Sequence, residues 1–245
     1  MAHISLKNLS IIFPIFDSSS RSIKRKIIDK AIGGKIKNNE KTNLINVKAL
    51  SEINLEINDG DRVGVYGHNG SGKSTLLRVI SGIYKPFPGN GEVIVNGKVV
   101  SLIDIYIGIE EELTGRENIF IRGILLGHSI KEINNFIGKI IDFSELEDYI
   151  DLPVRIYSSG MVLRLIFSIN MMASPEILLL DEWISVGDEN FKKKAEKKIQ
   201  EILLTTKILV IASHSLDLLK KNCNKIIFLE KGKIAKIENS LNNNL

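Results

Sequence analysis

One glycine-rich stretch constrains this chain more than any other feature. It reads Gly-His-Asn-Gly-Ser-Gly-Lys-Ser from Gly67 to Ser74 and fits G-x-x-x-x-G-K-[ST]. It lies between a predicted buried strand (62–66) and a predicted helix (73–82). In that setting the glycines let backbone N–H groups point inward, at the positive end of the helix dipole. The sequence therefore predicts a phosphate-binding loop in an α/β fold. The alternative is a chance glycine turn before a helix.

Two side chains of this loop have expected chemical tasks. Lys73 supplies a mobile positive charge for the outer phosphates, and the Ser74 hydroxyl can ligate a Mg²⁺ ion that bridges them. Thr75 and two leucines follow, as expected for the start of a helix with an apolar face.

A second pair of candidate residues ends the apolar run Ile177–Leu180. Asp181 and Glu182 are adjacent on a predicted strand, so their side chains point to opposite sides. Asp181 can then hold Mg²⁺ through water, while Glu182 can polarise an attacking water as general base. The alternative is a solvated strand end, where an Asp-Glu pair is ordinary.

The order of the predicted elements indicates a parallel sheet with helices on its faces. Strands are expected at 4–12, 49–57, 62–66, 177–181, 207–212 and 225–229, and helices at 73–82, 116–126, 131–143, 159–173, 189–204 and 216–221. Capping-box spacing marks two helix starts, at Thr114 with Glu117 and at Ser129 with Glu132. Strands at 91–95 and 98–102 are expected to form a hairpin that turns at Asn96-Gly97.

Composition excludes several classes of protein. The 245 residues are 44% hydrophobic and 25% charged, which is ordinary for a globular chain and excludes disorder and collagen. The single cysteine, Cys223, cannot form an internal disulfide, which favours a reducing compartment. No apolar run approaches the ~20 residues that span a bilayer, and the first residues do not form a signal peptide. A net charge of +4 is too small to identify a partner.

A third segment identifies the family. Tyr157-Ser158-Ser159-Gly160-Met161, followed by Arg164 on a predicted helix, resembles the signature of ABC transporter nucleotide-binding subunits, in the variant form found in polysaccharide exporters. A serine hydroxyl and glycine N–H groups at a helix start make an anion site, although an ordinary helix cap is the alternative. The resemblance implies a P-loop NTPase fold of ABC type, with a RecA-like core, an antiparallel β subdomain and an inserted helical subdomain.

The same resemblance implies a domain plan. Residues 1–238 form a single ABC ATPase domain, with a basic insertion at about 14–46 and the helical subdomain at about 113–173. Residues 239–245 are expected to be a frayed tail. Some exporters of this type carry an additional carbohydrate-binding domain, and none is expected here.

The resemblance also assigns the site residues. ATP and Mg²⁺ are the implied cofactors. Glu182 and His214 are the implied catalytic residues, and Ser74 and Asp181 the implied metal ligands. The implied ATP-binding residues are Phe13, Gly67, His68, Asn69, Gly70, Ser71, Gly72, Lys73, Ser74 and Thr75. Ser158, Ser159, Gly160 and Met161 act in trans on the second copy's ATP, and Asp188 of the D-loop communicates across the dimer.

Two of these assignments have alternatives. Phe13 is expected to stack on adenine, with Phe16 as the fallback, and the alternative is a core phenylalanine. His214 is expected to contact the γ-phosphate and orient water, whereas a lone histidine after a strand is commonly a polar loop residue.

One family element is missing. Most ABC ATPases carry a glutamine after the 91–102 segment, which helps to ligate Mg²⁺, but residues 106–109 contain none. A glutamate from the acidic run Glu110-Glu111-Glu112 is a possible replacement, and a solvated acidic loop is the alternative. This departure also resembles the polysaccharide-exporter branch.

The basic insertion supports a separate hypothesis. Isoleucines at helical spacing predict a basic amphipathic helix at 22–32, where Lys24, Arg25, Lys26 and Lys30 could contact anionic headgroups or the pyrophosphate of a lipid carrier. The alternative is a solvated face whose isoleucines pack on the core.

Taken together, these patterns predict the ATP-hydrolysing motor of an ABC exporter. The resemblance implies a homodimer at the cytoplasmic face of the inner membrane, bound to a separate polytopic permease that moves a lipid-linked polysaccharide. No nucleic-acid partner is expected. The alternative function is an ABC-type ATPase that acts on nucleic acid or ribosomes, although no coiled coil or second cassette accompanies the single phosphate loop. A module that binds ATP without hydrolysing it is a third possibility, against which Glu182 and His214 argue.

Overall fold

The chain forms two compact units. The computed structural model describes residues 1–16, 36–38, 44–103, 108–171, 175–182 and 189–239. The first unit contains Met1–Gly97, Leu179–Glu182 and Lys207–Leu245, and the second contains Lys98–Leu178 and Trp183–Thr206. The expected basic helix at 22–32 and residues 240–245 lie outside the described residues.

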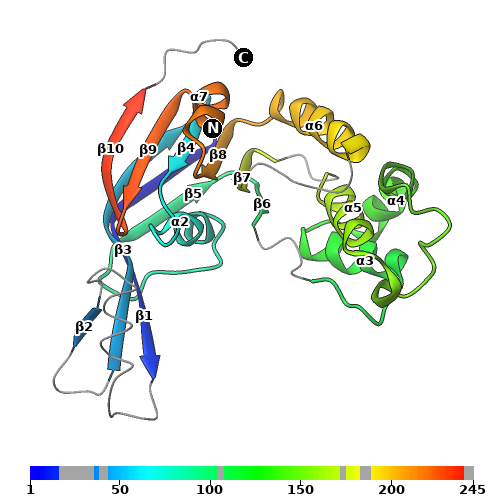
Figure 1. Ribbon diagram of the computed structural model, residues 1–245, viewed down its shortest axis with the longest axis horizontal. Coiled ribbons are helices and arrows are strands. Elements are labelled where there is room, and N and C mark those ends of the chain that lie inside the picture. Colours follow the sequence, from blue (N-terminus) through cyan, green and yellow to red (C-terminus); the bar gives the residue numbers. More distant parts are fainter. Residues whose placement is uncertain (17–35, 39–43, 104–107, 172–174, 183–188, 240–245) are drawn as a thin grey trace. The chain divides into compact units, whose positions relative to one another are not determined.

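A largely parallel sheet forms the centre of the first unit (Figure 1). Its strand order is β10 (Lys233–Asn239), β9 (Lys225–Glu230), β4 (Arg62–Tyr66), β8 (Ile208–Ser213) and the end of β7 (Ile177–Asp181). β4 pairs in parallel with both β8 and β9, and β10 runs antiparallel to β9. All six residues of β8 are buried, as expected for a strand whose first five residues are apolar. β10 extends to Asn239, one residue into the expected frayed tail.

An antiparallel sheet completes the first unit. Its order is β2 (Ile36–Asn38), β3 (Leu44–Asn58), β1 (His3–Phe16) and β5 (Glu92–Asn96). β1 was expected to end at residue 12, but it continues as a long ribbon with β3 in which Pro14 pairs with Asn46 and Phe16 with Leu44. The ends of the predicted insertion are therefore strand residues.

The hairpin expected around Asn96-Gly97 is wrong. β5 pairs with β1, with Leu6 opposite Val93 and Ile4 opposite Val95, whereas β6 (Val99–Leu102) neighbours β7. Gly97 does take a positive φ of 124°, so the chain turns there as its sequence indicates. The residues at the turn predict where the chain turns, but they do not determine which strand β5 pairs with. That pairing is determined by the packing of apolar side chains of β5 against β1.

Helices dominate the second unit. They are α3 (Gly115–Leu125), α4 (Ile130–Ser144), the short 3₁₀ turn η1 (Val154–Ile156), α5 (Ser159–Asn170) and α6 (Glu189–Leu203). Both predicted capping boxes are confirmed, since Thr114 and Glu117, and Ser129 and Glu132, bond each other reciprocally. Ile119, Ile133, Leu165 and Ile169 are fully buried in the core that α3, α4 and α5 share. The unit extends beyond the expected 113–173, because β6 and α6 belong to it.

Two shorter helices flank the parallel sheet in the first unit. α2 (Lys73–Ile80) follows the glycine-rich loop, and α7 (Leu216–Asn222) follows β8. Leu219 of α7 packs so closely on β4 that a Cβ added at Gly64 would lie 3.1 Å from it. Within the part of the chain that the structure describes, every helix is too short or too polar to cross a membrane.

Candidate functional site

The carboxyl ends of three neighbouring strands gather the predicted residues of the first unit. Tyr66, the last residue of β4, is in register with Ser213, the last residue of β8. The backbone N–H of Glu182, directly after β7, donates to the carbonyl of Ala212 at 2.8 Å. The residues that directly follow these strands, Gly67, Glu182 and His214, therefore lie at the same edge of the sheet. This is the edge at which parallel α/β sheets bind ligands.

The loop from Gly67 to Gly72 has a backbone that other residues do not readily adopt. Gly70 and Gly72 have φ values of 75° and 111°. A Cβ at Gly72 would lie 2.9 Å from the carbonyl oxygen of Ala49, and one at Gly67 would lie 2.5 Å from that of Leu229. Gly72 is also the N-cap of α2 and provides no side-chain cap. The first N–H groups of α2 are thus left to an anion.

Lys73 folds back over this loop. Its ammonium donates to the carbonyl oxygens of Gly67 at 2.7 Å and His68 at 3.2 Å, and the residue is buried. His68, Asn69 and Gly70 are exposed, so the tip of the loop is open to solvent. The buried Ser71 hydroxyl has no hydrogen-bond partner within the described residues. The lysine that is expected to bind phosphate therefore also ties together the first two residues of the loop.

Glu182 and His214 contact each other directly. The Nδ1 atom of His214 lies 2.6 Å from Oε1 of Glu182, and both side chains are more than half exposed. Glu182 has a φ of 66°, an unfavourable conformation for a residue with a Cβ. Next to His214, the Ser213 hydroxyl accepts the N–H of Ser215 at 3.1 Å and so shapes the turn. The sequence pattern identifies both residues but does not predict that they touch. The only indication of this contact is that each residue follows a buried strand and the two strands are neighbours.

Ser74 and Asp181 are the candidate metal ligands. Ser74 lies in the first turn of α2, Asp181 is the last residue of β7, and both are partly buried. Hydroxyl and carboxylate oxygens are the donors that Mg²⁺ prefers, so the donor set at this edge fits that ion.

Phe13 is half-buried in β1, so it is neither a core residue nor free. Its ring meets the Tyr84 ring edge-on, with centroids 5.2 Å apart. The guanidinium of Arg78 lies over that Tyr84 ring at 5.8 Å. No sequence pattern indicates that Tyr84 is an aromatic neighbour of Phe13. The side chain of Phe16, the fallback, lies outside the described residues.

The signature segment lies in the second unit, at the start of α5. The Ser158 hydroxyl accepts the N–H of Met161 at 3.2 Å and is the N-cap of the helix. Before it, the buried Tyr157 donates its hydroxyl to the carbonyl of Tyr149 at 2.6 Å, and burial raises the pKa of this phenol. Ser159 is exposed at the first helical position. The expected D-loop residue Asp188 lies outside the described residues, as do residues 104–107 of the segment without glutamine.

A buried asparagine fixes the acidic run that follows those residues. The Asn118 side chain accepts the N–H of Glu110 at 2.8 Å and donates to the carbonyls of Glu110, Leu113 and Thr114. Glu112 pairs with Arg155 at 3.4 Å. The three glutamates are exposed.

Comparison with known proteins gives the family. The family described as ABC transporter matches residues 50–185. The O-antigen export system ATP-binding protein RfbE of Yersinia enterocolitica is 42% identical over 234 residues, which are 96% of this chain and 97% of that protein. The teichoic acids export ATP-binding protein TagH of Listeria monocytogenes is 37% identical over 96% of this chain. This chain spans nearly all of RfbE but 66% of that TagH, which is less than two thirds.

Solved structures agree on the fold. A dimeric ATP-binding cassette in a post-hydrolysis state, bound to ADP and phosphate, matches with a TM-score of 0.68 at 21% identity, over 96% of this chain and 98% of that one. An ATP-binding subunit of an ABC transporter matches with a TM-score of 0.69 at 18% identity, over 96% and 89%. The expected α/β cassette fold is confirmed, and the chain belongs to the ABC transporter family.

Proposed function

We propose that this chain is the ATP-hydrolysing subunit of an ABC transporter that exports a lipid-linked surface polysaccharide across the cytoplasmic membrane. The observation that carries the cargo is the full-length similarity to RfbE, an ATP-binding protein of an O-antigen export system. The export systems named for the relatives favour this function over action on nucleic acid or ribosomes.

The geometry at the strand ends supports the hydrolysis itself. N–H groups of the loop and of α2 bind the phosphate chain, and the Lys73 ammonium moves from the carbonyls of Gly67 and His68 to the outer phosphates. Ser74 and Asp181 would hold Mg²⁺, which neutralises charge on the phosphates. Phe13 would stack on the adenine ring.

Glu182 and His214 act on the attacking water. The Glu182 carboxylate takes a proton from the water as it attacks the γ-phosphate, and His214 fixes that carboxylate through their 2.6 Å contact. The His214 side chain is more than half exposed, and it would also contact the γ-phosphate. A carboxylate that is aimed by a neighbour needs less reorganisation during the reaction.

The signature of a second copy completes the site in trans. Because the Ser158 hydroxyl is already the cap of α5, the contact to the facing γ-phosphate falls to Ser159 and Gly160. ATP then closes a head-to-tail homodimer and hydrolysis reopens it, since only ATP has the phosphate that both copies contact. Asp188 would communicate across that dimer.

The membrane partner is a separate permease, which places this chain at the cytoplasmic face of the membrane as a peripheral subunit. The second unit exposes large apolar side chains at the end of α3 and the start of α4, namely Ile124, Leu125 and Ile130. We assign the permease to this surface. Replacing Leu125 with Asp should abolish co-purification with the permease and leave the ATPase activity of the isolated chain unchanged.

The decisive experiment replaces Glu182 with Gln. The variant should bind ATP, form a dimer that size-exclusion chromatography with light scattering detects, and lose turnover by orders of magnitude. Glu92→Gln, at an exposed carboxylate of β5, is the matched control and should behave as wild type. Wild-type turnover in the Glu182 variant would refute the role of this residue.

The cargo is tested in cells. In a strain that lacks this gene, wild-type protein should restore surface polysaccharide and the Glu182→Gln variant should not. If the deletion strain still carries the polysaccharide on its surface, the export function is refuted. The proposed ATPase activity is not affected by that result.

A further inference from the structure

Three helices of the second unit meet around a cluster of phenylalanines. Phe143 lies at the end of α4, Phe167 in α5 and Phe191 in α6. The ring centroids are 6.0 Å apart for Phe143 and Phe167, 5.8 Å for Phe143 and Phe191, and 6.0 Å for Phe167 and Phe191. This aromatic cluster fixes the spacing of the helices but, being apolar, gives little directional specificity.

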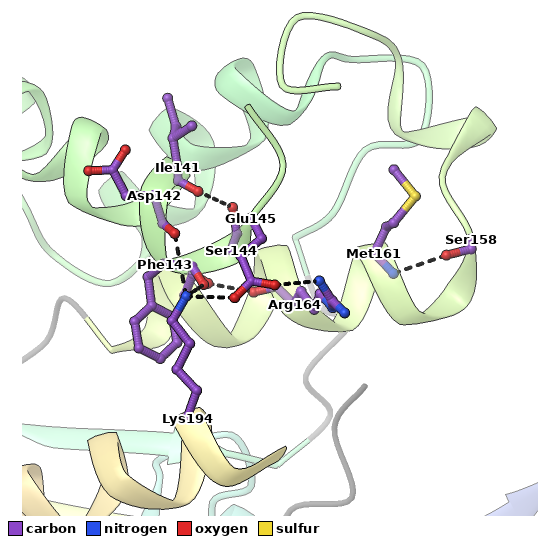
Figure 2. Close-up of polar contacts among 10 residues, drawn as sticks. Ile141, Asp142, Phe143, Ser144, Glu145, Ser158, Met161, Arg164 and Lys194 are labelled. Atoms are coloured by element: carbon purple, nitrogen blue, oxygen red, sulfur yellow. Dashed lines mark hydrogen bonds and ion pairs between the residues drawn. The ribbon is translucent and has the colours of Figure 1, made fainter. Parts of the chain in front are cut away.

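A single carboxylate above the cluster bridges the same three helices. Glu145 Oε2 accepts a hydrogen bond from Nη1 of Arg164 in α5 at 3.0 Å. Its Oε1 accepts one from Nζ of Lys194 in α6 at 2.9 Å. Figure 2 shows the Lys194 ammonium reaching the end of α4, with Arg164 on the other side of Glu145. Lys194 also donates to the carbonyl of Phe143 at 2.9 Å, so it caps the C-terminus of α4.

Both cations also lie over rings of the cluster. The guanidinium of Arg164 is 5.1 Å from the Phe191 centroid, and the ammonium of Lys194 is 4.8 Å from that of Phe143. Each cation therefore has a carboxylate oxygen in front of it and an aromatic face below it. Such two-sided contacts restrict the side chains more than an isolated surface ion pair would.

The backbone at Glu145 singles out its side chain. Glu145 is the C-cap of α4 with φ 57° and ψ 44°, the left-handed conformation that favours glycine. A residue with a Cβ is strained at this position, so a glycine would suit the backbone better. What glycine could not supply is the carboxylate between α5 and α6.

We propose that Glu145 is a positioning residue that locks the signature helix α5 to α6. In the chain, α6 begins at Glu189, directly after the expected D-loop residue Asp188, and α5 begins at the signature. The Glu145 bridge makes the two helices one rigid element, so α6 is held against the helix that presents Ser159 to the second copy. This inference rests on the proposed function, because it concerns the closing of the ATP dimer.

ATP binding by one copy and closing of the dimer should respond differently to the loss of Glu145, whereas a general loss of structure would impair both. ATP binding to the phosphate loop of the same chain uses residues of the first unit, so it should not depend on Glu145. Closing the dimer uses the signature, so it should.

The test compares Glu145→Gln, which keeps the shape without the charge, with Glu145→Gly, which also relieves the backbone. Both should lower kcat about tenfold and leave the affinity of the monomer for a fluorescent ATP analogue unchanged. Combined with Glu182→Gln, each should weaken the ATP-bound dimer about tenfold. The melting temperature of Glu145→Gly should equal or exceed that of wild type, whereas a purely structural role predicts a fall.

A matched control lies on the same helix. Lys198 and Glu201 form a 3.0 Å pair within α6 whose exposure is close to that of Lys194 and Glu145, and Glu201→Gln should change none of these quantities. Lys194→Met should reproduce the kcat loss of Glu145→Gln, and the double variant should lose no more than either alone. Additive losses would overturn the idea of a shared bridge.

The outcomes distinguish this inference from the proposed function. If Glu182→Gln alone forms no dimer with ATP, the proposed function fails. If it forms one, and the Glu145→Gly, Glu182→Gln protein forms it equally tightly, only the positioning role is overturned.

Discussion

At the scale of single residues, the Glu182–His214 contact matters most for activity. His214 Nδ1 is 2.6 Å from the Glu182 carboxylate, and Glu182 holds this place in an unfavourable left-handed backbone conformation. Strain of this kind persists where the surrounding structure enforces it, which is common at sites of chemistry. Here the hydrogen bond from the Glu182 N–H to the carbonyl of Ala212 in β8 helps to hold this backbone conformation.

His214→Ala should lower ATP turnover by about 10²-fold, because Glu182 loses the group that aims it. Steady-state phosphate release measures this effect. His3→Ala is the control, since His3 pairs with Glu56 in the antiparallel sheet and should not affect turnover. A His214 variant that turns over like wild type would show that Glu182 is aimed by another group.

Cys223 should be unreactive in the folded protein. It is buried at the C-cap of α7, and burial raises the pKa of its thiol to about 12, so the reactive thiolate is scarce at pH 8. An aromatic disulfide reagent should modify the thiol only as the chain unfolds in denaturant. Rapid reaction of one equivalent in buffer would contradict the buried position.

At the scale of elements, helix caps are small features with measurable effects. Ser129→Ala should lower the free energy of unfolding by about 1 kcal/mol at neutral pH, because the Glu132 N–H loses its acceptor at the start of α4. Urea unfolding followed by circular dichroism measures this difference.

The same cap should depend on pH. Hydrogen bonds from the Ser129 hydroxyl and N–H lower the pKa of Glu132 below its unfolded value. The stabilisation by its carboxylate is therefore present above the unfolded pKa and is lost as pH falls through the folded one. The unfolding curves of wild type and Ser129→Ala should approach each other in acid, and a constant gap would contradict the reciprocal cap.

Asn118 should contribute more than either cap. It is fully buried and bonds backbone groups of Glu110, Leu113 and Thr114. Asn118→Ala leaves the Glu110 N–H without its acceptor and removes one donor from each of three backbone carbonyls, so it should cost about 2–3 kcal/mol in chemical unfolding. Asn135→Ala, at an exposed position of α4, is a surface comparison and should change the unfolding free energy little.

Elements were predictable where the signal is local. Capping residues, the glycine-rich loop and the apolar run of β7 each specify their own structure, so their positions follow from the sequence. Pairing between distant segments does not, which is why β5 was assigned to β6 when it pairs with β1. For the same reason the contacts of Glu182 with His214 and of Glu145 with Lys194 were missed, because no pattern within either segment encodes a partner on another element.

At the scale of the whole molecule, ligand binding should be visible as stability. MgATP that binds only the folded Glu182→Gln protein should raise its unfolding free energy by about 2.7 kcal/mol at a hundredfold excess over Kd. In the presence of ATP the melting temperature should also rise as the protein concentration is raised, because ATP closes the dimer. In the presence of ADP it should not depend on protein concentration. Chelation of Mg²⁺ should remove the rise, and a shift independent of protein concentration would argue against ATP-driven dimerisation.

The long ribbon of β1 and β3 has a consequence for how this chain can change. Phe16 and Leu44 are paired across the ribbon, so the segment between them begins and ends at neighbouring positions of the sheet, and its strand β2 pairs with β3. Closing a longer loop at such a point adds little free energy, since the entropic cost grows only with the logarithm of its length. Evolution or an engineer can therefore lengthen that segment with little loss of stability, provided that the pairing of β2 with β3 is kept.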